Sequence, residues 1–208
     1  LVGGVAMKKG FLILASLLGL TAIIASSWPQ TTPTSSLIAG LKSYDKVTRD
    51  KAKQDLIEMG EAAVQPVLTL IEEENQQAKS RAAEAVAASA TGNLHQGQTL
   101  LQESRKYDDN IQTGFDVLTG IGAPAVEPML ILLKQERLRY RNLLIDSLGE
   151  IGDQRAIEQL VSELDKSASR NATQALEKIT GEKFGQDKSK WREWWAAKKQ
   201  EKQERQEE

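Results

Sequence analysis

The sequence predicts an all-α fold in which helix pairs stack into a short α-solenoid, and three observations support this. Alanine, leucine, glutamate, glutamine and lysine dominate a chain of 208 residues whose aromatic content is only 5%, a balance that favours helices over strands. Similar apolar segments recur along the chain. Glycines also recur, at intervals of about 30 residues, at positions 60, 92, 122, 152 and 181. We therefore expect about four to five helix pairs, closed by a tryptophan-rich helix.

The repeat is clearest where two segments are compared directly. Residues 59–71 and 121–133 are identical at six of thirteen positions, including the glycine, an Ala-Val pair and a proline. Residues 151–164 form a looser third copy. Apolar residues at helical spacing precede each glycine, and glycine suits a helix C-terminus because the chain turns there through positive φ. The repeating unit is therefore a helix, a tight glycine turn and a second helix.

These residues resemble the HEAT-like repeat family, in the short form first named for phycobilisome lyases. The resemblance rests on Gly-x-x-Ala-Val-x-Pro-x-Leu at 60–68 and 122–130, and on Leu-Gly-Glu-Ile-Gly-Asp-x-x-Ala-Ile at 148–157. It covers residues 41–181. Residues 91–100 depart from the pattern, and there we expect only a short, polar second helix. The resemblance implies a protein-interaction scaffold, although a fold does not by itself define a function.

An export signal is predicted within residues 1–27, with Met7 as the start. Lys8 and Lys9 precede an apolar run that ends at Ile24, and small residues follow. A positive stretch, an apolar run and small residues, in this order, are typical of a secretory signal peptide. The run is shorter than the about 20 apolar residues that a membrane-spanning helix requires. We therefore expect export to the periplasm or another extracytoplasmic compartment.

Two alternatives remain for this N-terminal region. An uncleaved signal would use residues 11–25 to anchor the protein in the inner membrane, or the segment would be a buried helix of the domain. Residues 28–40 then contain two prolines among serines and threonines. Such a composition has little to bury and predicts an extended linker.

Composition excludes several classes of site. The net charge is −2, which gives no electrostatic reason to expect nucleic-acid binding. The chain contains no cysteine, and therefore no disulfide, thiolate metal site or cysteine nucleophile. His95 is the only histidine and has no ligand at metal-binding spacing, and no Gly-x-Ser-x-Gly nucleophile elbow occurs. We expect no catalytic residue, no metal site and no cofactor.

Aromatic residues gather near the C-terminus, in a predicted capping helix at residues 182–198. Three tryptophans have the spacing i, i+3 and i+4, which places them on one helix face. We expect them to cover the exposed flank of the last repeat, with a stacking platform for a sugar or a peptide as the alternative. The aromatic residues concerned are Phe184, Trp191, Trp194 and Trp195. Residues 199–208 carry mixed charge and predict a fraying helix or a disordered tail.

A candidate binding surface follows from the second helix of each repeat. Helix periodicity assigns Val67, Leu68, Met129 and Leu130 to the core and leaves a column of side chains in solvent. We call this column the ridge; it consists of Gln65, Thr69, Glu127, Ile131, Glu158 and Ser162.

The predicted function is a non-enzymatic scaffold that binds a protein partner through the ridge. Membrane contact is expected only through an uncleaved anchor. The alternatives are a phycobilin lyase-like enzyme, by analogy with the family's name, and a membrane-tethered structural module. The enzyme is disfavoured because such lyases work in the cytoplasm and this chain carries an export signal.

Overall fold

The computed structural model describes residues 33–135 and 138–207, and all regular secondary structure within these ranges is helical. The all-α prediction is therefore confirmed for the described residues. The predicted signal and its anchor alternative lie outside them. In the described ranges, no helix combines the length and the apolarity needed to cross a bilayer. The elements are α2 (Pro33–Leu41), α3 (Lys46–Met59), α4 (Glu61–Ala90), α5 (Leu94–Ile121), α6 (Ala123–Leu133), α7 (Arg141–Ile151), the 3₁₀ turn η1 (Gln154–Ala156), α8 (Ile157–Glu163), α9 (Ser169–Thr180) and α10 (Lys188–Glu207).

Most of the predicted linker is a helix that belongs to the core. We expected an extended chain over residues 28–40, but α2 begins at residue 33. Leu41 is buried, and Leu37 and Ile38 pack against the same core. These three residues share one helix face. The linker prediction is therefore wrong from residue 33 onward, because the serines and threonines concealed an apolar stripe.

The predicted glycine turns are confirmed. The five recurring glycines have φ between 59° and 84°, a region that side chains with a Cβ rarely adopt. Gly152 and Gly181 end α7 and α9 in the left-handed conformation, and their N–H groups donate to the carbonyls of Leu148 and Glu177. The chain thus turns at the positions that the repeat predicts.

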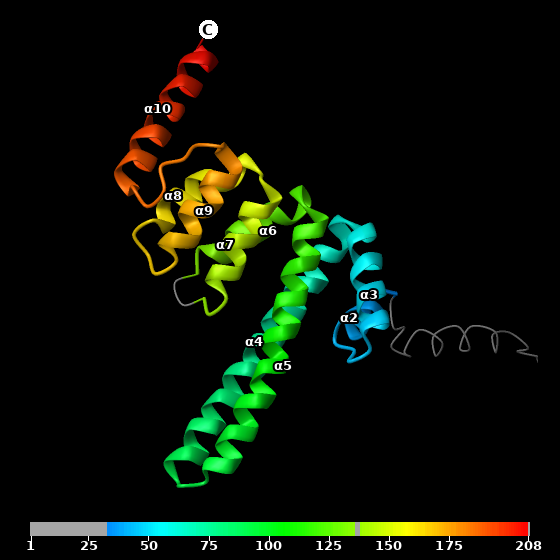
Figure 1. Cartoon of the computed structure of the whole chain (residues 1–208). Coiled ribbons are helices and arrows are strands. Elements are labelled where there is room, and N and C mark those ends of the chain that lie inside the picture. The colour runs from blue at the N-terminus through cyan, green and yellow to red at the C-terminus, as the bar shows by residue number, and fades with distance from the viewer. Residues whose placement is uncertain (1–32, 136–137, 208) are drawn as a thin grey trace, which may run out of the picture. The chain divides into compact units, whose positions relative to one another are not determined.

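The second predicted repeat does not form a separate helix pair. Helices α4 and α5 run without interruption for 30 and 28 residues. They lie side by side and meet at the turn that contains Gly92 (Figure 1). The short polar helix expected after Gly92 is the first part of α5. Residues 67–90 contain neither proline nor glycine and are rich in strong helix formers, so no residue ends α4 between its two predicted halves.

One hydrophobic cluster extends through the described residues from Leu41 to Trp191. Val67 and Met129 are fully buried, and Leu68 and Leu130 nearly so. This burial confirms the helix phase that defined the ridge. Helices α7 and α9 pack against each other in this core, and so do α8 and α9, while α10 contacts α8.

Gly149 sets the close approach of α7 and α9. A Cβ at this position would lie 2.8 Å from both Cα and Cβ of Ala175, so the two backbones would have to separate. We expect Gly149→Ala to lower the free energy of unfolding by about 1–3 kcal/mol, as overpacking does, although alanine is the better helix former. Urea denaturation measures this. Gly120→Ala is the matched control, because the three atoms nearest to its Cβ all belong to the side chain of Ile57, whereas a backbone atom lies close at Gly149. Equal losses in the two variants would contradict the close approach.

Candidate partner-binding surfaces

All six ridge residues are exposed, on α4, α6 and α8. The two hydroxyls are satisfied locally, since Thr69 donates to the carbonyl of Gln65 at 3.0 Å and Ser162 to that of Gln159 at 2.6 Å. Ile131 is the apolar member, and 59% of its surface is exposed. The ridge residues are therefore polar except for one large apolar side chain.

Trp191 belongs to the core. It is fully buried, and its indole N–H donates to the carbonyl of Gly185 at 3.1 Å. Its ring meets Phe184 and Trp194 edge-on, with centroids 4.9 and 6.0 Å apart. A ligand cannot stack on this buried ring. Trp194 and Trp195 are half-buried, and their indole nitrogens are buried without a hydrogen-bond acceptor in the described structure.

Helix α10 is both shorter at its start and longer at its end than the predicted cap. Residues 182–187 form a loop, and the helix continues through the charged residues to Glu207. Lys198, Lys202 and Arg205 are spaced i, i+4 and i+7, which places them on one face of this helix. The predicted tail is therefore the second half of α10. The mixed charge of this segment did not suggest that basic residues share one face of the helix.

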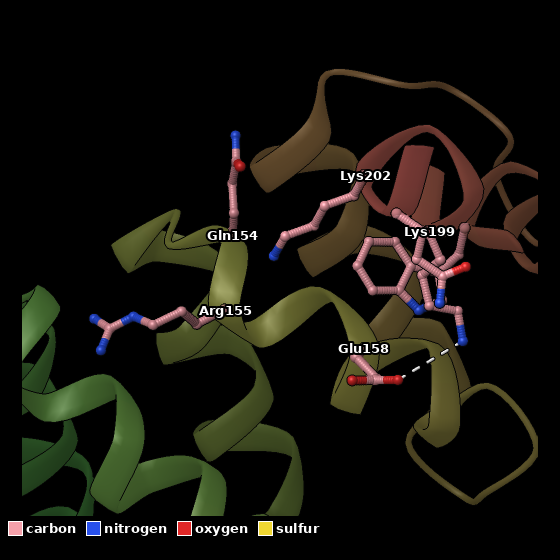
Figure 2. A pocket seen from close by; sticks show the side chains of 7 residues that line it. Gln154, Arg155, Glu158, Lys199 and Lys202 are labelled. Carbon is pink, nitrogen blue, oxygen red and sulfur yellow. Dashed lines mark ion pairs between the residues drawn. The ribbon is translucent and has the colours of Figure 1, made fainter. Parts of the chain in front are cut away.

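These basic residues line a groove between α10 and the segment of η1 and α8. Two adjoining cavities of about 320 and 570 Å³ share Gln154, Arg155, Trp195 and Lys202 as lining residues. Figure 2 shows the smaller cavity, with Lys202 and Lys199 on α10 near Gln154 and Glu158. The side chain of Arg155 points away from the two lysines (Figure 2), and its Nη2 donates to the carbonyl of Ala123 at 2.8 Å. We call the two cavities together the basic groove. The basic groove was not predicted from the sequence, although the helical spacing of Lys198, Lys202 and Arg205 was an available signal.

The cations of the basic groove differ in how they are paired. Arg155 forms an ion pair with Asp153, with Nη2 and Oδ2 2.7 Å apart, and the hydrogen bonds from Arg155 hold the pKa of Asp153 below its usual value. Lys199 pairs with Glu158 at 3.7 Å (Figure 2). Lys202 and Arg205 form no ion pair with a carboxylate of residues 33–135 and 138–205, and Nε of Arg205 donates to the carbonyl of Glu201 at 3.1 Å. These two cations remain available to an anion.

A buried ion pair joins α7 to α8. Nη1 of Arg141 lies 2.7 Å from Oε2 of Glu163, and both side chains are almost completely buried. The same guanidinium donates to the carbonyls of Leu133 and Gln135, at the end of α6. Lys166 donates to the second oxygen of Glu163 at 2.9 Å. The cluster ties three chain segments together, and its visible role is structural.

Two further polar residues have ordinary surroundings. The hydroxyl of Tyr140 donates to Glu72 at 3.1 Å, and burial, followed by the charge of Glu72, raises the pKa of Tyr140. His95 is exposed in the first turn of α5, as expected. Within the described residues, no three side chains of the metal-ligating types gather.

The far end of the α4–α5 hairpin exposes apolar side chains that the sequence analysis missed. Val86, Leu94 and Leu101 are three of the six large apolar residues exposed in the described structure. Residues 85–102 contain no lysine, arginine, aspartate or glutamate. This charge-free run was the available signal, because an ordinary solvated helix surface carries charge.

No family model matches the chain, and no curated protein and no solved structure matches it either. Function is therefore inferred from the surfaces described above.

Proposed function

We propose that the protein is an exported, non-enzymatic scaffold of the HEAT-like α-solenoid type that binds a protein partner through the ridge. The observation that supports this is the arrangement around Ile131. An exposed isoleucine lies on a ridge whose other members are polar. Protein interfaces commonly have this anatomy, with an apolar centre and a polar rim.

The rigidity of the ridge supports the same proposal. Ile131 and Glu127 are one turn apart on α6, and their neighbours Met129 and Leu130 are buried. The backbone of a packed helix loses little freedom when a partner binds, so more of the contact energy remains for affinity. The buried charges of Arg141 and Glu163 pair with each other inside the protein, so they do not offer a binding surface.

A double substitution on α6 tests the ridge. A photo-reactive amino acid at Gln65 first identifies the partner by crosslinking and mass spectrometry. Glu127→Lys with Ile131→Lys should then raise the Kd for that partner by about tenfold or more, because it removes the apolar centre and reverses a neighbouring charge. The free energy of unfolding should change by only about 0.5 kcal/mol per site, since both residues are exposed. Calorimetry and denaturation measure the two effects.

The matched control makes the same two chemical changes on α3. Val47→Lys with Glu58→Lys also replaces one exposed apolar residue and one exposed glutamate by lysine. This variant should bind the partner as tightly as the unmodified protein. Equal weakening in both variants would point to net charge rather than to the ridge. Unchanged affinity in the α6 variant would move the partner to another surface.

A further inference from the structure

The basic groove has an excess of basic residues, whereas the chain as a whole has a slight excess of acidic ones. The whole sequence has 29 acidic and 27 basic residues. The charged residues that line the groove are instead five basic ones and a single acid, which is already paired: Arg155, Lys198, Lys199, Lys202, Arg205 and Glu158. Three of the five cations are paired, Arg155 with Asp153, Lys198 with Glu201 and Lys199 with Glu158. Lys202 and Arg205 supply the positive potential of this concave surface, which a net-negative chain can carry locally. The groove is therefore complementary to an anionic ligand.

The groove also offers an apolar wall. Trp195 lines both cavities, while Trp194, Ile157 and Ile179 line the larger one. The ammonium group of Lys199 lies 5.9 Å from the centroid of the Trp195 ring, so cationic and aromatic groups are adjacent. A ligand that fits presents both anionic groups and apolar groups.

We propose that the basic groove binds an acidic, extended segment of a partner protein. Carboxylates of the segment pair with Lys202 and Arg205, which lack carboxylate partners among the described residues, and an intervening apolar side chain packs on Trp195. This site is distinct from the ridge, with which it shares only Glu158. It therefore stands or falls separately from the proposed function.

An acidic peptide fits the groove better than a nucleic acid does. A single strand would carry phosphates beyond the cavities of about 320 and 570 Å³, where the surface of a net-negative chain repels them. Nucleic-acid binding also depends on many phosphate contacts. A peptide of a few alternating acidic and apolar residues satisfies the groove without extending over the rest of the surface.

Fluorescence anisotropy on the full chain tests the proposal. The probe is a short fluorescein-labelled peptide of alternating glutamate and leucine, compared with the same peptide carrying glutamine in place of glutamate and with a labelled oligothymidine. We expect the glutamate peptide to bind, more tightly at low salt than at high salt, and the other two to bind much more weakly. Lys202→Glu with Arg205→Glu should raise the Kd for the glutamate peptide by about tenfold or more.

The control reverses the charge of one lysine and one arginine that do not line the basic groove. Lys79→Glu with Arg105→Glu changes an exposed lysine and an exposed arginine on α4 and α5, and it should leave the Kd unchanged. The proposal is overturned if the glutamate peptide does not bind, if the glutamine peptide binds equally well, or if both double variants weaken binding equally. Binding of the oligothymidine in preference to the peptide would also overturn it and would identify a nucleic-acid site.

Discussion

Trp191→Ala is expected to lower the free energy of unfolding by about 3–5 kcal/mol, the range for deletion of a large aromatic side chain from a core. The indole is fully buried, packs edge-on against Phe184 and Trp194, and donates to the carbonyl of Gly185. Its removal therefore leaves a cavity and an unpaired carbonyl in the loop before α10. Chemical denaturation followed by circular dichroism measures the loss.

Trp195→Ala is the control for this result. Trp195 is half-buried, and its indole nitrogen has no acceptor, so we expect a clearly smaller loss of stability. The comparison separates packing from binding within one aromatic cluster. If Trp191→Ala unfolded like the unmodified protein but lost affinity for its partner, the aromatic cluster would be a binding site rather than the packed end of the core.

Local periodicity predicted these helix faces correctly because sequence spacing determines which residues share a face, and the apolar face of a helix packs into the core. Val67 and Met129 were assigned to the core and are fully buried, and Gln65 and Glu127 were assigned to solvent and are exposed. The glycine turns could be predicted for a similar reason, since positive φ is a property of one residue. Fold class and the exposure of the ridge thus follow from short-range patterns.

The number of helices could not be predicted from the repeat. The recurring glycines indicate where the chain turns. They do not indicate whether a helix also ends midway between two successive glycines. The alanine-rich sequence between Val67 and Ala90 has no helix breaker. Its high helix propensity therefore favours one continuous α4, although the repeat predicted two helices there. The same reasoning applies to α10, whose charged second half is composed of lysine, glutamine, glutamate and arginine, which are good helix formers.

Contacts between residues that are distant in the sequence could not be predicted, for a different reason. The basic groove forms because α10 packs near Arg155, about fifty residues earlier, and spacing within α10 says nothing about that neighbour. Likewise, periodicity places Arg141 on a helix face without indicating that this face is buried against Glu163. Tertiary packing determines which charged side chains are buried and desolvated.

Glu163→Gln is expected to destabilise the protein by about 3–5 kcal/mol, the cost of breaking a buried ion pair from one side. Glutamine retains the shape of glutamate but not its charge. The buried guanidinium of Arg141 would lose its opposing charge, although it would still donate to the carbonyls of Leu133 and Gln135, and Lys166 would lose its carboxylate. The midpoint of guanidinium denaturation measures the loss, and Glu150→Gln, which breaks the exposed pair with Lys178, should cost at most about 1 kcal/mol.

A double-mutant cycle identifies what Arg141 contributes besides its charge. Arg141→Leu with Glu163→Leu removes both ions, and apolar replacement of a whole buried pair is often nearly neutral. Here the recovery should be incomplete, because the carbonyls of Leu133 and Gln135 lose the donor that satisfies them at the end of α6. The double variant should therefore lose less stability than the sum of the two single variants, yet remain less stable than the unmodified protein. Strict additivity would contradict this expectation, because it would mean that Arg141 and Glu163 contribute no coupling energy to stability.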